Sequence, residues 1–468
     1  MIRNRKPYLC SCLAVLFLTF TFCLVNSAMA GESSLKIDDE GIKTNIEKAE
    51  PLVKEITGLT FKEKMKYELV KREAFRDAMT KELLPLLKSA MKGAPDDIIA
   101  RQAETSAVAW SQSLLGKYSS LKKELLLVPD NAQTQVERYE IKNADFQDFV
   151  FLFVAYQMVN VMDDQCFDLQ NKATSMENAE AGQAAHALAE GHAVYVINKI
   201  TARLKLSETA KDAMIKSVSG ITDETNAAQK QRFNLFYVKG PEFVEAIINR
   251  KGIAGVSEAF AAPPVSMRQI LNPDEYLTPS TTKAFDCAKL IEKVAKKLPT
   301  KGMQSQSGQL SSMNLSAVLV SQGIPEKEAN SVAGDCLNGA AFTAAKQTSK
   351  QIVVVATVLD FNTSKAAADY AGLMNKIEKS SRDQVNAMLN AKLNIVKDEA
   401  LKLDGFDSVR YQHVETKVDE QITTQFSVDG MIGKFYVALA FINPENIPTE
   451  KSISDILTYI NKERLNMQ

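Results

Sequence analysis

Side chains that can bind a metal ion are concentrated in residues 186–192 of this chain. His186 and Glu190 are four residues apart, so on a helix they share one face and could offer two ligands to the same ion. His192 follows Glu190 by two residues and points to another side of the helix. Catalytic zinc normally takes three protein ligands. A complete site therefore needs side chains from a second element.

A second segment with polar side chains lies at residues 155–169, Ala-Tyr-Gln-Met-Val-Asn-Val-Met-Asp-Asp-Gln-Cys-Phe-Asp-Leu. One hypothesis is that Asp163, Asp164 or Cys166 completes a relocated metal site with Glu190. The alternative is that the histidines are surface or cap residues. Asp164 and Asp168 could act as a general acid and a general base, or could form hydrogen bonds at a helix end. The sequence leaves these alternatives open.

Few residues of this chain could perform other kinds of catalysis, because its 468 residues include only 3 histidines and 6 cysteines. His413, the third histidine, lies in a predicted strand and is expected to be structural. There is no Gly-rich phosphate loop, no G-x-S-x-G elbow and no G-x-G-x-x-G dinucleotide motif. The chain has 56 basic and 57 acidic residues. It therefore lacks the excess of basic residues that is typical of nucleic-acid-binding proteins, and we expect no nucleic-acid partner.

The first thirty residues have the pattern of a bacterial signal peptide. A basic start with Arg3, Arg5 and Lys6 precedes an apolar run from 13 to 25, and Ala-Met-Ala at 28–30 fits a cleavage site. Cleavage would leave 53 basic and 57 acidic side chains. After residue 30 the sequence has no run of about 18 apolar residues, which is the length that a membrane-spanning helix needs. We therefore expect a periplasmic or secreted protein with no stable span after cleavage.

Cleavage would also remove three of the cysteines and leave Cys166, Cys287 and Cys336 in an oxidising compartment. At most one disulfide can form within the chain. Cys287 with Cys336 is the pair to consider, and three buried free thiols are the alternative, because sequence does not supply the geometry that a disulfide requires.

The elements that must position these residues are predicted from periodicity. Apolar side chains at spacings of three and four predict helices from 42 to about 92, 96 to 115, 143 or 145 onward, and 177 to 204, with a strand at 124–128. The run 149–154 is apolar on all sides, so its helix is expected to be buried. Gly191 would let a neighbouring helix approach closely.

A boundary is predicted near residue 280, after a segment rich in proline. Beyond it we expect helices at 281–297, 364–402 and 449–465, an exposed loop at 301–312, and strands at 351–359, 409–416, 421–428 and 434–442, with Asp429-Gly430 as a hairpin turn. The expected fold class is α+β: a mainly helical part at residues 31–279 after the leader at 1–30, and a small α+β domain at 280–468.

Residues 155–169 and 187–193 together resemble a family of secreted bacterial zinc metallopeptidases with a zincin-like fold. Its members carry H-E-x-x-H on a helix that continues as A-L-Q-D-Q-H-F-D-L, and A-L-x-E-G-x-A on a second helix. The matching positions in this chain are 164–165, 167–169, 187–188, 190–191 and 193. Shorter resemblances at 58–62, 125–128, 236–243, 262–276 and 353–359 extend over nearly the whole chain after the leader.

The resemblance implies a zinc site that this chain has lost. In the motif two histidines at i and i+4 bind zinc, the glutamate between them acts as general base, and a glutamate of the second helix completes the ligands. Here Tyr156 and Asn160 stand at the histidine positions and Gln157 at the glutamate position, while Glu190 is retained. Gln157 cannot accept a proton near neutral pH. We expect no catalytic residue, no metal and no cofactor at this degenerate site.

These features predict a pseudo-peptidase, a secreted non-catalytic protein that binds a peptide or an envelope protein or acts as a structural component of the envelope. The three replaced side chains either form hydrogen bonds with one another and with Glu190, or line a binding cleft. The alternative is a hydrolase whose metal site has been rebuilt around Glu190, His186 and His192.

Overall fold

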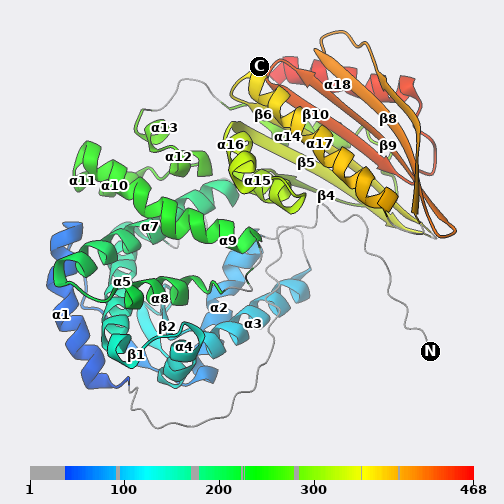
Figure 1. Ribbon diagram of the computed structural model, residues 1–468. Coiled ribbons are helices and arrows are strands. Elements are labelled where there is room, and N and C mark those ends of the chain that lie inside the picture. Colours follow the sequence, from blue (N-terminus) through cyan, green and yellow to red (C-terminus); the bar gives the residue numbers. More distant parts are fainter. Residues whose placement is uncertain are drawn as a thin grey trace, which may run out of the picture. The chain divides into compact units, whose positions relative to one another are not determined.

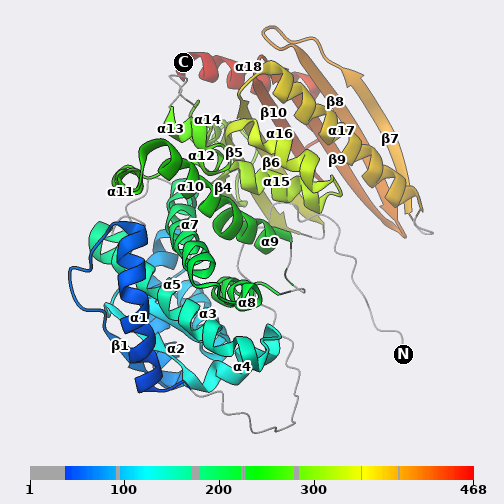
Figure 2. The ribbon, with the colours of Figure 1, turned by 60° about the vertical axis from the view of Figure 1, so that its left-hand side comes forward.

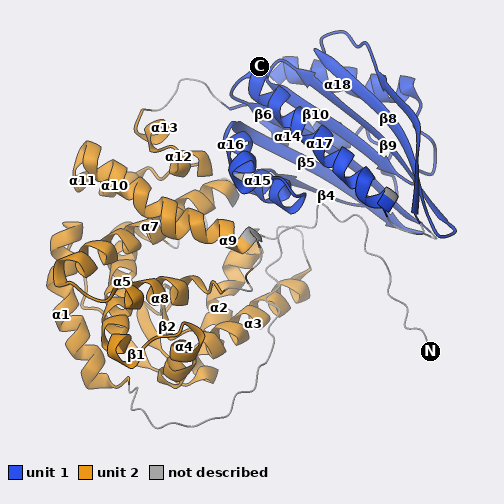
Figure 3. Cartoon of the chain, in the orientation of Figure 1, with its two compact units in different colours: residues 1–16, 280–468 blue, residues 17–279 orange. Residues whose placement is uncertain are grey.

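The structure, a computed structural model, describes residues 37–90, 95–169, 179–222, 225, 227–278, 284–348, 350–387 and 391–467. The predicted signal peptide at residues 1–30 lies outside the described residues. The described residues up to 278 belong to one compact unit and those from 284 onward to another, coloured separately in Figure 3. We call them the N-terminal unit and the C-terminal unit.

The N-terminal unit is mainly helical. Its elements are α1 (Asp39–Thr57), β1 (Tyr67–Leu69), α2 (Arg72–Ala90), α3 (Asp96–Ser113), β2 (Gly116–Ser119), β3 (Glu124–Leu127), η1 (Pro129–Asn131), α4 (Ala132–Arg138), η2 (Asn143–Asp145), α5 (Phe146–Phe167), α7 (Ala179–Leu204), α8 (Glu208–Ser219), α9 (Ala227–Phe233), η3 (Asn234–Lys239), α10 (Gly240–Lys251), α11 (Ala254–Ala261), α12 (Met267–Leu271) and α13 (Pro273–Leu277).

Helix α5 is the centre of this unit, and it packs against α1, α7 and α8 (Figures 1 and 2). Every residue from Phe149 to Val159 is buried, so the helix has no polar face. This confirms the prediction from its apolar composition. Burying so much apolar surface is the main favourable contribution to the stability of the unit. Polar side chains on α5 are therefore held in low-dielectric surroundings, where each needs a partner.

A three-stranded sheet lies beside α5, with the strand order β1-β3-β2. Strand β1 is parallel to β3, and β2 is antiparallel to β3. The prediction of a strand at 124–128 is confirmed by β3. The prediction of one helix from 42 to 92 is wrong, because the chain leaves α1 at Gly58 in a left-handed conformation with φ of 65° and forms β1 before α2 begins.

The C-terminal unit contains a seven-stranded antiparallel sheet with the order β4-β5-β6-β10-β9-β8-β7. Its elements are α14 (Cys287–Ala295), β4 (Gln304–Gln309), α15 (Ser312–Ser321), α16 (Glu326–Gly334), β5 (Cys336–Gln347), β6 (Gln351–Phe361), α17 (Ser364–Ala387), β7 (Ala391–Ala400), β8 (Ser408–Val418), β9 (Gln421–Ile432), β10 (Phe435–Ile442) and α18 (Glu450–Met467).

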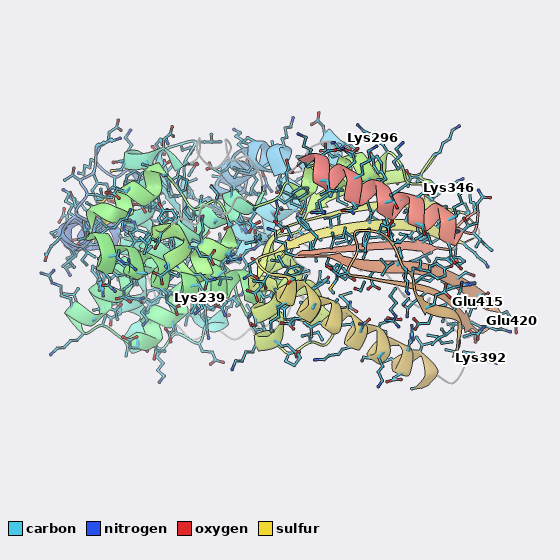
Figure 4. All side chains as sticks on the ribbon, turned by 90° about the horizontal axis from the view of Figure 1, so that it is seen from above. Lys239, Lys296, Lys346, Lys392, Glu415 and Glu420 are labelled. Carbon is cyan, nitrogen blue, oxygen red and sulfur yellow. The ribbon has the colours of Figure 1, made fainter. Side chains whose placement is uncertain are left out.

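Helices cover both faces of this sheet. Helices α14 and α18 share one apolar cluster with it, and α15, α16 and α17 share another. Figure 4 shows α18 and α17 on opposite sides of the strands. In the central strands β6 and β10 one face is buried and the other is at least partly buried along most of the strand, which explains their apolar composition. With the helical N-terminal unit, this arrangement gives the α+β fold that the sequence predicts.

Three local predictions in this unit are wrong. The expected loop at 301–312 contains the edge strand β4, whose polar side chains are exposed while its backbone pairs with β5. The expected helix at 364–402 ends at Ala387, and β7 follows it. Asp429 and Gly430 lie inside β9, opposite Ala438 and Val437, and the chain turns at Gly433 with φ of 57°.

None of the helices in the described residues combines the length and the apolar character needed to cross a membrane.

Candidate functional site

Tyr156 of α5 and Glu190 of α7 are in direct contact. The phenol of Tyr156 donates a hydrogen bond to Oε2 of Glu190. Tyr156 is 2% exposed, and the Glu190 side chain is 12% exposed. A buried phenol requires an acceptor, and the carboxylate provides one. The packing of α5 against α7 thus brings together two of the four positions that the sequence marks as a degenerate site.

The second oxygen of Glu190 also has a protein partner. Nε2 of His186, one turn earlier on α7, lies 2.9 Å from Oε1. Burial would raise the pKa of Glu190. The hydrogen bond and charge of His186 oppose this, with help from the charge of Lys117 and the hydrogen bond from Tyr156, and lower the pKa to about 2. Glu190 is therefore an ionised acceptor with a protein contact on each oxygen.

Tyr237 adds a second phenol to this group. It lies on η3, a π-helical segment between α9 and α10, where one wider turn changes the direction of the side chains. Burial raises the pKa of Tyr237 well above its ordinary value, and the negative charge of Glu190 raises it further. Its side chain is close enough to Tyr156 and Glu190 for both to influence its pKa. We call Tyr156, His186, Glu190 and Tyr237 the tyrosine–glutamate cluster.

A contact between two glycines positions η3 over Glu190. A Cβ on Gly191 would lie 2.3 Å from the carbonyl carbon of Gly240, and a Cβ on Gly240 would lie 2.5 Å from the carbonyl oxygen of Ala187. The two backbones therefore touch at residues where any side chain would collide. Gly191 follows Glu190 directly and Gly240 follows η3. The predicted close approach at Gly191 is confirmed.

Gln157 and Asn160 do not join this cluster. Oε1 of Gln157 accepts a hydrogen bond of 3.2 Å from the backbone N–H of Tyr118 on β2, and Gln157 is buried. Asn160 is partly exposed, and within the described parts of the chain its side chain makes no hydrogen bond. The three replaced side chains thus have three different surroundings, and only Tyr156 contacts Glu190.

His192 belongs to a separate buried pair. Its Nδ1 lies 2.8 Å from Oδ2 of Asp163, and both side chains are almost completely inaccessible. Burial raises the pKa of Asp163, although the contact with His192 opposes the shift. The ring of His192 meets Phe260 edge to face. His192 therefore contacts neither His186 nor Glu190, the other two residues of the predicted rebuilt site.

Asp164 and Asp168 act at the end of α5. Asp164 accepts hydrogen bonds from the phenol of Tyr118 and from Lys123, at 2.8 Å and 2.7 Å. Asp168 is the left-handed residue that terminates the helix, with φ of 54°. Asp168 thus ends the helix, as expected of a residue at this place, whereas the Asp164 carboxylate binds side chains of β2 and the turn after it rather than the end of α5. Across the described ranges, no three or more His, Cys, Asp or Glu side chains are grouped so that they could hold a metal ion.

His413 lies on β8, stacked against Phe426 of β9 with ring centroids 4.2 Å apart. Both residues lie in the C-terminal unit and away in sequence from every residue of the tyrosine–glutamate cluster. The structural role expected for His413 agrees with this packing.

The sequence did not identify Tyr237 as part of the cluster or Lys117 as a charge that acts on Glu190. Tyr237 lies in residues 236–243, one of the shorter segments whose resemblance is described above. No local pattern in that segment indicates a contact with Glu190. The ring of the preceding Phe236 lies 4.8 Å from that of His186. Nothing in the sequence indicates that Lys117 acts on Glu190, because an isolated lysine on a short strand is common.

A cleft of about 610 Å³ has Tyr237 among its lining residues. We call it the helical cleft, because its walls come from α7, α8 and the η3–α10 region. It is lined by Val194, Tyr195, Asn198, Lys199, Lys211, Asp212, Ile215, Lys216, Phe233, Tyr237, Val238, Pro241, Glu242 and Glu245. Apolar and aromatic side chains alternate there with three lysines and three acidic residues. Tyr237 is thus shared between the cleft and the tyrosine–glutamate cluster.

Comparisons with known proteins identify no family for this chain. No protein-family model matches it, and no curated protein matches it. A solved structure described as "a putative hydrolase with a novel fold" from Chloroflexus aurantiacus is similar over 54% of this chain and 94% of its own, with 17% sequence identity and a TM-score of 0.39.

Proposed function

We propose that this protein is a secreted pseudo-peptidase, a non-catalytic peptidase-like protein that acts by binding. The observation that carries the proposal is the hydrogen bond from Tyr156 to Glu190. By the resemblance, these positions would hold the first histidine ligand and the third ligand of a zinc ion. A neutral phenol whose pKa is raised by burial remains protonated and donates to the carboxylate, so the two side chains satisfy each other.

The position of the general base supports the same proposal. Gln157 is an amide, and its Oε1 already accepts the N–H of Tyr118. An amide cannot take a proton from water near neutral pH. His192, the only fully buried histidine among the described residues, is engaged with Asp163. Neither side chain is placed to activate a nucleophile beside Glu190.

The helical cleft supports a binding role. Its volume of about 610 Å³ is in the range of small-ligand pockets, and its lining combines aromatic rings with lysines and acids of both signs. A peptide has the matching mixture of apolar side chains, backbone polar groups and charges of both signs. We therefore propose a peptide, or a peptide segment of an envelope protein, as the ligand.

Metal analysis of the purified protein tests the loss of zinc chemistry. We expect less than stoichiometric zinc in the wild type and no peptide hydrolysis that a chelator abolishes. Stoichiometric zinc with chelator-sensitive hydrolysis would overturn the proposal.

A reversion experiment tests the ancestry of the site. The triple substitution Tyr156→His, Gln157→Glu and Asn160→His restores the motif, and we expect about one zinc ion per chain with Glu190 as third ligand. The matched control carries the same three changes with Glu190→Gln, and its zinc content should fall back toward that of the wild type. Circular dichroism of each variant shows whether it is folded. Equal zinc in the folded triple variant and the wild type would count against the ancestry.

A further inference from the structure

Cys287 and Cys336 lie close together in the C-terminal unit although they are far apart in sequence. Cys287 is the first residue of α14, Cys336 is the first residue of β5, and both are buried. Their thiols share one acceptor, the carbonyl oxygen of Asn338, at 3.7 Å and 3.4 Å. The two sulfur atoms can therefore be no farther apart than the sum of these two distances.

Several hydrogen bonds hold the chain before α14 against the sheet at this point. Nδ2 of Asn338 donates to the carbonyl oxygen of Phe285 at 2.8 Å, and the N–H of Phe285 donates to Asp360 at 3.0 Å. The pairing of β5 with β6 is irregular between Cys336 and Asn338, which changes the direction of β5 next to Cys287. The proximity of the two cysteines is thus supported by hydrogen bonds from the side chains of Asn338 and Asp360 to the backbone of Phe285.

We propose that Cys287 and Cys336 form a disulfide when the protein folds in an oxidising compartment. Thiols are weak hydrogen-bond donors, so the two hydrogen bonds to Asn338 contribute little stability. A bond between them would close a loop that contains α14, β4, α15 and α16. This inference depends on the predicted export of the chain and not on the loss of zinc chemistry.

The oxidation proceeds by thiol–disulfide exchange with a disulfide donor such as oxidised glutathione. One cysteine thiolate attacks the donor, breaks its S–S bond and releases one glutathione thiol. The second cysteine then attacks the mixed disulfide and releases the second glutathione. The two cysteines lose two electrons and two protons, and glutathione disulfide is reduced to two thiols.

The burial of the two cysteines determines at which stage of folding this exchange can happen. Burial raises the pKa of the Cys287 thiol well above its ordinary value, and the charges of Asp360 and Cys336 raise it further. A buried thiol with a raised pKa is a poor nucleophile. The disulfide should therefore form while the chain folds, and the folded reduced protein should oxidise slowly.

Thiol counting in the full mature chain tests the proposal. We expect one free thiol per chain, Cys166, after refolding of the reduced denatured protein in a mixture of reduced and oxidised glutathione. Mass spectrometry of a non-reduced digest should show a peptide pair that links Cys287 to Cys336. Reduction should lower the melting temperature by about 5 °C or more. Three free thiols in the refolded protein would overturn the proposal, as would a different pairing.

Variants separate the disulfide from other effects of a cysteine. Cys287→Ser and Cys336→Ser should each leave two free thiols and should make the melting temperature insensitive to reductant. The matched control Cys166→Ser should leave none and should keep the full response to reductant. If the wild type does not respond to reductant and its thiol count equals that of the fully reduced protein, the disulfide is absent and the proposal fails.

Discussion

The phenol of Tyr156 donates a hydrogen bond to Oε2 of Glu190 across the contact between α5 and α7. His186 holds the other carboxylate oxygen, and Tyr237 reaches the same pair from η3. A buried negative charge is thus surrounded by two phenols and one imidazole. Four predictions test this arrangement and the elements around it.

Removing the phenol should destabilise the protein. Tyr156→Phe deletes the donor to a largely buried carboxylate, and we expect a loss of about 1 to 3 kcal/mol in the free energy of unfolding at pH 7. Urea unfolding measures it. A double-mutant cycle with Glu190→Gln should give a coupling energy well above the error of measurement.

A matched phenol–carboxylate pair on the surface provides the control. Tyr67 donates to Asp39 at 2.8 Å in an exposed position. Tyr67→Phe should cost less than about 0.5 kcal/mol, because water replaces the lost partner. Equal losses for Tyr67→Phe and Tyr156→Phe would mean that burial does not strengthen the Tyr156 interaction.

A side chain at Gly191 should destabilise the protein, because the backbone of Gly191 touches that of Gly240. Gly191→Ala places a Cβ 2.3 Å from the carbonyl carbon of Gly240, so α7 and α10 must move apart, at a cost of about 2 to 4 kcal/mol. Gly182→Ala is the control on the same helix, because nothing lies within 4 Å of its Cβ, and it should stabilise α7 by up to about 1 kcal/mol. Thermal unfolding distinguishes the two, and equal effects would contradict the close packing.

Glu180 should make stability depend on pH. Burial raises its pKa to about 7, and the hydrogen bond from the N–H of Met267 opposes the shift only in part. The folded protein therefore holds the Glu180 proton more tightly than the unfolded chain does. The resulting stabilisation is complete below about pH 4.5 and decreases as the pH rises through about 7.

The substitution Glu180→Gln should remove this dependence. Between pH 5 and pH 8 the variant should lose about 1 to 3 kcal/mol less stability than the wild type. Glu208→Gln is the control, because that side chain is 69% exposed, and its pH profile should follow the wild type. Parallel profiles for all three proteins would show that Glu180 does not titrate near neutral pH.

The helical cleft should be the place where peptides bind. Val238 lines the cleft and is 40% exposed, so Val238→Asp changes the lining with little effect on the core. We expect about tenfold weaker binding of peptides selected on an array, measured by fluorescence polarisation. Val265→Asp is the control, because Val265 is exposed and is not among the cleft residues. Unchanged binding in Val238→Asp would place the peptide elsewhere.

Periodicity predicted the helices well wherever one helix buries a face throughout its length. Helix α5 is the clearest case, since its buried and mainly apolar segment is longer than a typical strand. The edge strands β4 and β7 were missed for the opposite reason. Their side chains are largely exposed, and pairing with a neighbouring strand is what makes these segments strands.

The sequence indicated which residues to consider at the candidate site, but it did not indicate which of them are in contact. The motif spacing marked Tyr156, Gln157, Asn160 and Glu190, and helix geometry placed His186 beside Glu190. Whether these side chains meet depends on how α5 packs against α7. The structure separates Gln157, which contacts β2, from Tyr156, which contacts Glu190.

The sequence by itself determined the helical spacing of the site residues and the buried character of α5, because each depends on the local chain and its composition. Only the tertiary structure decided which partners each polar side chain has. Tyr156 and Glu190 are 34 residues apart, and Tyr237 reaches them only because the backbones at Gly191 and Gly240 touch. Such contacts depend on the packing of distant elements, and that packing minimises exposed apolar surface over the whole unit.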